Sequence, residues 1–163
     1  MRTAVLAGAT GLVGGLLLRR LLDAQAYARV IVLSRRPLQI NHAKLTVEVA
    51  DFERLPALPR GVDDVFCCLG TTLANAGNRQ AFARVDHDHV VALGRRARNS
   101  GPRNESALGA ARLLAPLLRG RLARYRAIRA DAVAAAMLEV ARTGQPPPGA
   151  IESDTISRLA SMI

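Results

Sequence analysis

Short apolar runs alternate with polar and glycine-rich stretches along the first half of the chain. The runs at 30–34 and 64–69 are almost continuously apolar, which is typical of parallel strands covered on both faces. The run at 45–49 alternates apolar and polar positions, and a further short run occupies 2–7. These patterns predict four β-strands, each followed by small or polar residues where the strand ends.

Helical spacing separates the strands and dominates the second half of the chain. We expect one helix from Gly15 to Leu22 and a longer one from Asp86, as N-cap, to Gly101, as C-cap. The remaining predicted elements are a helix at 107–118 bent at Pro116, a possible strand at 122–128, a helix at 131–144 capped by Asp131, and a short helix capped by Ser153. Strands alternating with helices predict an α/β fold, a Rossmann-like doubly wound parallel sheet.

Length and composition point to one compact unit. A chain of 163 residues predicts a single domain, 1–163, and the 3% share of aromatic residues predicts an aliphatic core. We see no cationic leader with a cleavage site and no apolar run that could span a bilayer, so we expect a cytoplasmic protein that does not contact membranes. Cys67 and Cys68 are adjacent, and neighbours on a strand point to opposite faces, which argues against a structural disulfide.

Positive charge is concentrated in one window of the sequence. Residues 95–130 hold ten arginines and one acid, Glu105, which gives +9 of the total +10. One interpretation is a surface that binds nucleic acid or an acidic partner. Because Tyr125 is the one aromatic residue in this window, platforms for base stacking are nearly absent. We therefore favour solvated helix faces and do not expect nucleic acid as a partner.

A glycine-rich turn joins the first strand to the first helix, an order typical of a dinucleotide-phosphate site. Gly8 lets the chain turn off the strand, Gly11 leaves room for a pyrophosphate, and Gly14 lets the helix pack closely. The helix then directs its free N–H groups at the phosphates. An ordinary tight turn is the structural alternative. The predicted cofactor-binding residues are Gly8, Ala9, Thr10, Gly11, Leu12, Val13 and Gly14.

Basic residues follow the second strand. A sheet that binds NAD usually carries an acid at this position to hold the ribose 2′-hydroxyl. This chain has Ser34, Arg35 and Arg36 instead, and two arginines can clamp a 2′-phosphate. The alternative is a solvated basic turn before Pro37. We predict a nicotinamide dinucleotide as ligand, with NADP preferred over NAD.

The ends of the third and fourth strands supply further candidate residues. Asp51 can accept a hydrogen bond from an adenine amino group while Phe52 packs beside the ring, although Asp51 could instead cap a short helix. Small residues after the fourth strand let a nicotinamide ribose lie across the strand ends. The cofactor-binding residues predicted here are Asp51, Phe52, Cys68, Leu69, Gly70, Thr71 and Thr72. We expect both cysteines to be buried small hydrophobic residues and not nucleophiles.

The run Asp86-His87-Asp88-His89 has the composition of a metal site. Consecutive helical residues fan out by about a quarter turn each, so only some pairs could share an ion. His42 is the one other histidine that could complete a set. We interpret the run as a solvated helix start and predict no metal site.

Together, the motifs GATGLVGG, SRR, Asp51-Phe52, FCCLGTT and VDHDHVVALGRRARNSG resemble the atypical short-chain dehydrogenase/reductases, which bind NAD(P) on a Rossmann fold. More narrowly, they are similar to the Tat-interacting-protein-type oxidoreductases. The resemblance covers 1–101, which we interpret as the nucleotide-binding half. It resumes at 102–163, which resembles the family's C-terminal tail.

The resemblance implies that an internal segment is missing between Gly101 and Pro102. Family members carry there a fifth strand, a serine-bearing segment, a helix with Tyr-x-x-x-Lys, and a sixth strand. The tyrosines of this chain are Tyr27 and Tyr125 and its one lysine is Lys44, so no such pair exists. We therefore predict no catalytic residue and a truncated sheet that lacks the fifth and sixth strands.

The missing segment has structural and functional consequences. Its absence would leave the fourth strand as an apolar edge without lysine or proline, which residues 122–128 or a second subunit of a homodimer could cover.

Three functional hypotheses stay open. They are an NADP(H)-binding reductase-like protein without a catalytic centre, an active NAD(P)-dependent oxidoreductase if the segment is missing only from the printed sequence, and a basic module that binds an acidic protein or nucleic acid.

Overall fold

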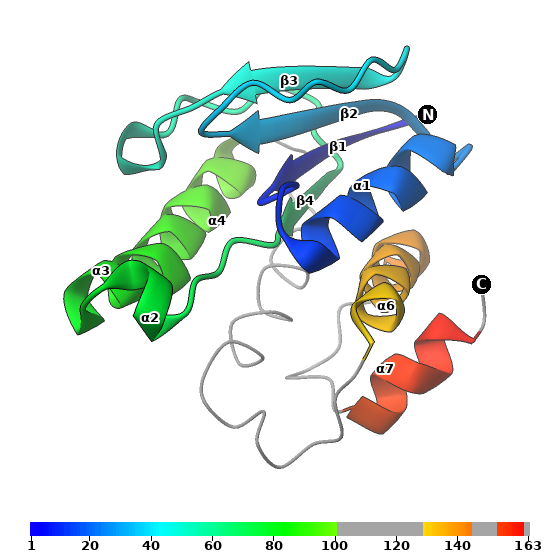
Figure 1. Cartoon of the computed structure of the whole chain (residues 1–163). Helices are drawn as coiled ribbons and strands as arrows, with labels where there is room; N and C mark the ends of the chain where they lie inside the picture. The colour runs from blue at the N-terminus through cyan, green and yellow to red at the C-terminus, as the bar shows by residue number, and fades with distance from the viewer. Residues whose placement is uncertain (101–128, 145–152, 162–163) are drawn as a thin grey trace.

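The computed structural model describes residues 1–100, 129–144 and 153–161, and Figure 1 shows how the elements are arranged. One parallel sheet has the strand order β3-β2-β1-β4. Its strands are β1 (Arg2–Ala7), β2 (Tyr27–Ser34), β3 (Leu45–Val49) and β4 (Asp64–Cys67). The predicted α/β, Rossmann-like parallel architecture is confirmed. The fourth strand is two residues shorter than the predicted run at 64–69.

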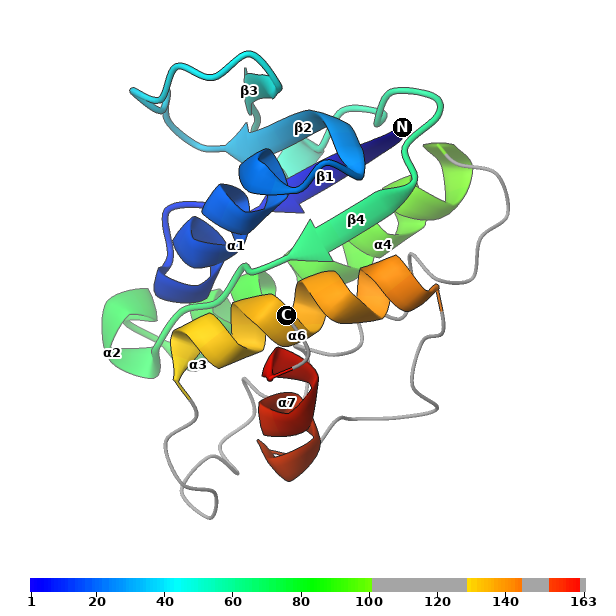
Figure 2. The same cartoon turned by 90° about the vertical axis from the view of Figure 1, so that its right-hand side faces the viewer.

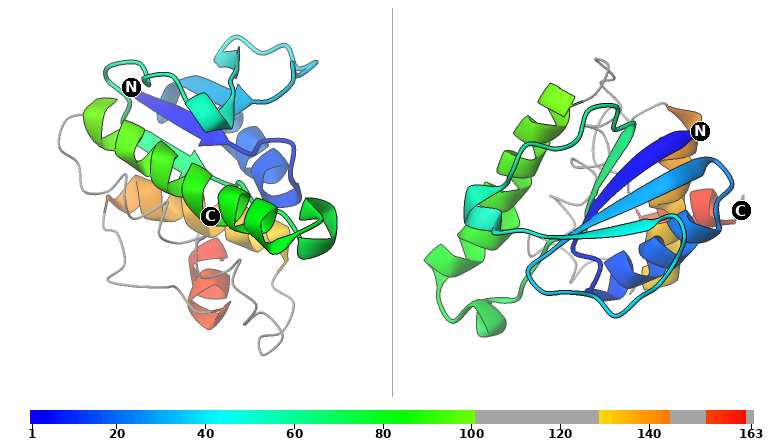
Figure 3. Two further views of the ribbon diagram at one scale, coloured as in Figure 1. Left: turned by 90° about the vertical axis from the view of Figure 1, so that its left-hand side faces the viewer. Right: turned by 90° about the horizontal axis from the view of Figure 1, so that it is seen from above.

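Helices cover both faces of the sheet. Two of them, α1 and α6, lie on one face, and α4 lies on the other, as the right-hand view of Figure 3 shows. The helices are α1 (Leu12–Asp23), α2 (Leu73–Ala76), α3 (Arg79–Ala83), α4 (His89–Ser100), α6 (Ala130–Thr143) and α7 (Ser153–Ala160), with a 3-10 turn η1 (Phe52–Arg54) and a π-helical turn η2 (Arg84–Asp88). In Figure 2, α7 lies against α6. None of the helices in the described ranges is long and apolar enough to cross a bilayer.

The alternation of side chains along β1 creates two apolar layers. Leu6 faces α1 and α6, where Leu17 and Met137 are buried with it. Val5 faces α4, where Leu93 is buried. Burial of each such side chain stabilises the fold by about 1.5–3 kcal/mol. The continuous apolar runs of the sequence are therefore explained by a sheet that is covered on both faces.

Helix boundaries differ from the sequence prediction in two places. The first helix begins at Leu12 and not at Gly15, with Gly11 as its N-cap. The helical run predicted from Asp86 begins earlier, at α3, because Asn78 is the N-cap there and its side chain accepts a hydrogen bond from Ala81 N at 2.8 Å. Asp86 therefore lies inside the helical run and caps nothing.

In the described C-terminal part, the predicted helix α6 is confirmed, but its predicted N-cap is wrong. Helix α6 ends at Gly144, which has a φ of 65° and forms a left-handed C-cap. Asp131 lies in the first turn of α6 and not at the N-cap, and pairs there with the N-cap residue Arg129 at 3.0 Å. The predicted elements at 107–118 and 122–128 lie outside the described residues.

Strand β4 is an edge of the sheet within the described part of the chain. Its pairing partner there is β1, and none of the described strands pairs with its other side. Residues 122–128, one of the two predicted covers, lie outside the described ranges. The homodimer that would supply the other cover stays a prediction.

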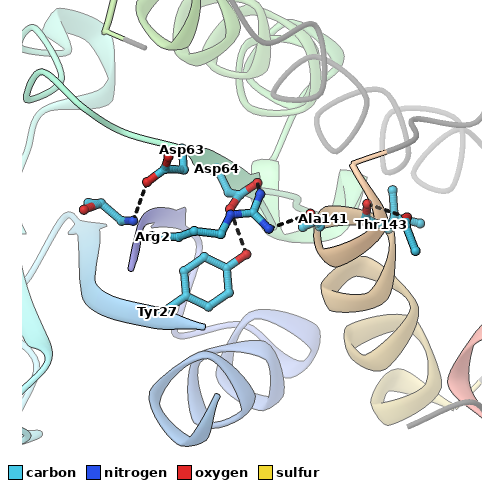
Figure 4. A network of polar contacts seen from close by, with 8 residues as sticks. Arg2, Tyr27, Asp63, Asp64, Ala141 and Thr143 are labelled. Carbon is cyan, nitrogen blue, oxygen red and sulfur yellow. Dashed lines mark hydrogen bonds and ion pairs between the residues drawn. The ribbon is translucent and has the colours of Figure 1, made fainter. Parts of the chain in front are cut away.

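A polar cluster joins β1, β2, β4 and α6 at the amino ends of the strands (Figure 4). The Asp64 carboxylate is 3% exposed and accepts hydrogen bonds from Arg2 Nη2 at 2.5 Å and from the Tyr27 hydroxyl at 2.8 Å. Arg2 Nη1 also donates to the carbonyl of Ala141, near the end of α6, at 2.8 Å. Burial and the Asp64 carboxylate raise the pKa of Tyr27, so this hydroxyl stays protonated and remains a donor.

We predict that Tyr27→Phe destabilises the protein. The substitution keeps the ring and removes one of the two donors to a buried carboxylate, which costs about 2 kcal/mol of unfolding free energy. Urea denaturation measures this loss as a lower midpoint with an unchanged slope. Equal midpoints for the two proteins would show that the hydroxyl contributes nothing.

Candidate functional site

A cleft of about 220 Å³ opens at the carboxyl ends of the strands. It is lined by residues that follow each of the four strands and by the helical run after β4. Of the residues predicted from the sequence, it contains Gly8, Ala9, Thr10, Gly11, Ser34, Arg35, Phe52, Cys68, Leu69, Gly70 and Thr71. The parallel sheet thus brings together segments far apart in the sequence.

The other predicted residues lie beside the cleft and not in its lining. Arg36 is exposed, and Asp51 and Thr72 cap the short turns η1 and α2. Among the residues of the glycine-rich turn, Leu12 is exposed, Val13 packs against the core, and Gly14 is buried under the turn. The side chains of these residues do not line the cleft.

The glycine-rich turn is held by close backbone contacts. Gly8 has a φ of 88°, and a Cβ atom on it would lie 2.4 Å from the carbonyl oxygen of Cys68. A Cβ atom on Gly14 would lie 2.1 Å from the carbonyl oxygen of Gly8. Both distances exclude any side chain, so the turn, the start of α1 and the end of β4 can approach one another only with glycine at these positions.

The start of α1 is suited to an anion. Its N-cap Gly11 makes no side-chain cap, and the first turn holds no acid. The first N–H groups of a helix have no partner within the helix, and the helix dipole places partial positive charge there. Gly11 itself is exposed in the cleft, and without a side chain it leaves these N–H groups open to a phosphate.

Some of the residues that follow β2 and β3 line the cleft, and others form local turns. Arg35 is exposed and lines the cleft, whereas the backbone N–H of Arg36 donates to Ser34 Oγ at 3.3 Å in a local turn. Asp51 Oδ1 accepts a hydrogen bond from Glu53 N at 2.9 Å, so the capping alternative for Asp51 is the one that the structure shows. Phe52 is buried and lines the cleft.

The helical run after β4 forms a wall that the sequence prediction missed. Besides Leu33, the cleft contains Val85 and His89, and Asp86 Oδ1 accepts a hydrogen bond from Thr71 N at 3.1 Å. The interpretation of Asp86 and His89 as a solvated helix start was therefore wrong. The spacing of Val85 and His89, four residues apart, was the available signal because such residues share one helix face.

In the described part of the chain, no group of three His, Cys, Asp or Glu side chains could hold an ion. His87 and Asp88 are exposed and pair with each other at 2.9 Å. Asp86 and His89 turn inward, away from that pair. The side chains of residues 86–89 therefore point in different directions, as those of consecutive helical residues must.

Two free thiols lie at and just after the end of β4, where Cys67 is buried and Cys68 is half-buried. Burial raises the pKa of Cys67 to about 11 and that of Cys68 to about 12. A thiol with such a pKa is protonated at neutral pH and is a poor nucleophile. Both cysteines therefore act here as small apolar residues, as expected.

The tyrosine and the lysine in the described residues hold structural positions. Tyr27 belongs to the polar cluster at the amino ends of the strands, opposite the cleft. Lys44 Nζ donates to the carbonyls of Leu22 and Ala24 at 2.9 and 3.0 Å, where it satisfies the C-terminal end of α1. Neither side chain lines the cleft. Tyr125 lies outside the described residues.

Comparisons with known proteins show what the chain is similar to. A model of the "NAD dependent epimerase/dehydratase family" matches residues 4–145. Similar curated proteins are the mitochondrial protein FMP52 of Eremothecium gossypii, 36% identical over 61% of this chain and 46% of its own length, and the protein HTATIP2 of Rattus norvegicus, 36% identical over 61% and 43%. A mitochondrial fmp52 protein of Aspergillus clavatus is 36% identical over 62% and 47%. The matches thus span less than half the length of these relatives.

Two glycine variants test the close contacts of the turn. Gly14→Ala should lower the unfolding free energy by about 3 kcal/mol or prevent folding, because the new Cβ would overlap a carbonyl oxygen. Gly94→Ala, inside α4 and with nothing within 4 Å of its Cβ, should raise it by up to about 1 kcal/mol. Urea denaturation compares the two. Equal effects would mean that the turn can relax around a side chain.

Thiol labelling tests the protection of the cysteines. At neutral pH, the folded protein should react with iodoacetamide at least about a hundredfold more slowly than free cysteine, because the raised pKa values leave little thiolate. After unfolding in guanidinium chloride, both thiols should react at the ordinary rate. Rapid labelling of the folded protein would contradict the buried, protonated state.

Proposed function

The chain belongs to the NAD dependent epimerase/dehydratase family, and on this basis we propose that its cleft binds a nicotinamide dinucleotide with preference for NADP(H). The observation that carries the proposal is the glycine-rich turn. Gly8 and Gly14 are packed too closely for any side chain, while Gly11 is open to the cleft at the start of α1. Packing requires glycine at positions 8 and 14, and ligand binding would explain the glycine at position 11.

The pyrophosphate would be held by the backbone. The N–H groups of Leu12 and Val13 lie in the first turn of α1, where they have no partner within the helix. Binding through N–H groups does not depend on the direction of the side chains, so the exposed side chain of Leu12 is compatible with this role. The helix dipole adds to the attraction.

The preference for NADP(H) rests on charge at the end of β2. Ser34 and Arg35 line the cleft, and no acid stands at the position where NAD-binding sheets usually hold the ribose 2′-hydroxyl. An arginine guanidinium offers paired donors that match a phosphate. We assign the main contact to Arg35, because the side chain of Arg36 does not line the cleft.

The two ends of the dinucleotide would lie along the strand ends. The adenine would pack beside Phe52, and the nicotinamide ribose would lie near Gly70 and Thr71, which Asp86 holds in place. A bound nicotinamide cofactor supplies hydride transfer. This chain's residues would orient it and exclude water from one side.

We further propose that these 163 residues bind the cofactor without turning it over. The sequence holds no Tyr-x-x-x-Lys, and Tyr27 and Lys44 serve the fold at other places. The alternative is an active oxidoreductase whose catalytic segment is missing only from the printed sequence. An intact-mass measurement of the natural protein separates the two, since a mass well above 17.4 kDa would show a further segment.

Oligomeric state and location stay predictions. A homodimer would cover the open side of β4, and sedimentation at several concentrations would show it as a doubled mass. Fractionation of cells would test the predicted cytoplasmic location.

Isothermal titration tests the cofactor preference. The protein should bind NADPH more tightly than NADH, and Arg35→Ala should weaken NADPH binding about twentyfold because a charge-assisted contact to the 2′-phosphate is lost. The affinity for NADH should stay within about twofold. Arg36→Ala is the matched control and should change neither affinity strongly. Failure of the unaltered protein to bind either dinucleotide would overturn the proposed function.

A further inference from the structure

His89 follows directly after the π-helical turn η2. Its backbone N–H donates to the carbonyl of Arg84, five residues earlier, so the helix is widened at this point. Such turns cost helix stability and are frequent at functional sites. Here the widened turn lies beside the cleft, because Val85 and His89 both line it.

The imidazole of His89 carries a polar atom that the described residues leave unpaired. The side chain is 14% exposed, and Nε2 is buried without a hydrogen-bond partner there. Glu53 Oε1 lies 3.5 Å away, within ion-pair range but outside hydrogen-bond geometry. A buried unpaired nitrogen destabilises the empty protein, so its presence in a cleft wall calls for a partner supplied from elsewhere.

A second unpaired atom lies on the same turn. Asp86 Oδ1 holds Thr71 N, but Asp86 Oδ2 is buried and unpaired among the described residues. The polar cluster around Asp64 shows the opposite pattern, since both of its carboxylate oxygens are paired. Unpaired polar atoms are thus found at the wall of the cleft and not at the other end of the sheet.

The surroundings of His89 suit a flat heteroaromatic ring. Phe52 lies across from it, with 5.8 Å between the ring centroids and 38° between the ring planes, and both residues line the cleft. An apolar ring together with one hydrogen-bonding nitrogen is the combination that binds a purine base through its face and its edge. A half-turn of the imidazole exchanges Nε2 with Cε1, and Glu53 is 57% exposed and can swing aside.

We propose that His89 is the base-specific contact of this site: its imidazole nitrogen hydrogen-bonds to the edge of the adenine, while Phe52 packs against the face of the ring. The inference rests on the proposed function and assigns one of its contacts to a residue outside the glycine-rich turn. It also explains why an unpaired nitrogen is kept at a position that a phenyl ring could fill.

The variant His89→Phe separates binding from stability. It keeps an aromatic ring and removes both nitrogens, so the affinity for NADPH should fall about tenfold while the melting temperature of the empty protein stays equal or rises. The same loss should appear with 2′,5′-ADP, which contains the adenosine half alone. His89→Gln, which restores a hydrogen-bonding group, should recover most of the affinity.

Two controls complete the design. His87→Phe makes the same change two residues away, where the side chain is 63% exposed, and should leave affinity unchanged. Glu53→Gln removes the charge near His89 and should change neither the melting temperature nor the binding. A drop in melting temperature for both His89→Phe and Glu53→Gln would identify His89 as a structural partner of Glu53 and overturn the inference.

The outcomes also distinguish the two proposals. If the unaltered protein binds NADPH and His89→Phe binds it equally well, the role of His89 is wrong and the proposed function stands. If the unaltered protein binds neither NADPH nor 2′,5′-ADP, the proposed function fails, and the role of His89 fails with it.

Discussion

One close contact sets the geometry of the candidate site: the glycine-rich turn is packed between the end of β4 and the first turn of α1. Gly8 meets the Cys68 carbonyl and Gly14 meets the Gly8 carbonyl, each at a distance that leaves no space for a Cβ atom. This contact fixes where α1 begins and therefore where its free N–H groups point. The same short turn thus combines the close packing of Gly8 and Gly14 with an open helix start at Gly11.

The elements that sequence reasoning predicted are those whose signals are local. A strand, a glycine turn and a helix within the first 23 residues are specified by neighbours in the chain, and so is the C-cap at Gly144. The start of the helical run after β4 was missed because its cap, Asn78, looks like any loop asparagine. Asp86 was misread because its partner, Thr71, lies 15 residues away and is brought close only by the fold. The pairing of Phe52 with His89 depends on the same long-range packing.

The two ends of the sheet differ in whether their buried polar groups have hydrogen-bond partners. At the amino ends, Arg2, Tyr27 and Asp64 satisfy one another, and Arg2 ties α6 to the sheet through Ala141. A buried carboxylate there would be costly without both donors, so this cluster serves cohesion. At the carboxyl ends, the first N–H groups of α1, Asp86 Oδ2 and His89 Nε2 have no hydrogen-bond partner in the described structure. The amino ends of the strands are thus stabilised by paired polar groups, whereas the unpaired groups lie at the carboxyl ends, where we propose that the ligand binds.

The four-stranded sheet of the described residues is enough to form the cleft. The ends of the strands in the order β3-β2-β1-β4 all contribute to the cleft that the described residues form. Helix α6 packs Val133 and Met137 into the same apolar layer as α1, and this layer closes one face of the sheet. Tyr27 and Lys44 make structural contacts away from the cleft and do not form the tyrosine and lysine pair that a reductase of the resembled type uses for catalysis. In the proposal made above, cofactor binding and catalysis are therefore separable, since the cleft that the described strand ends form contains neither Tyr27 nor Lys44.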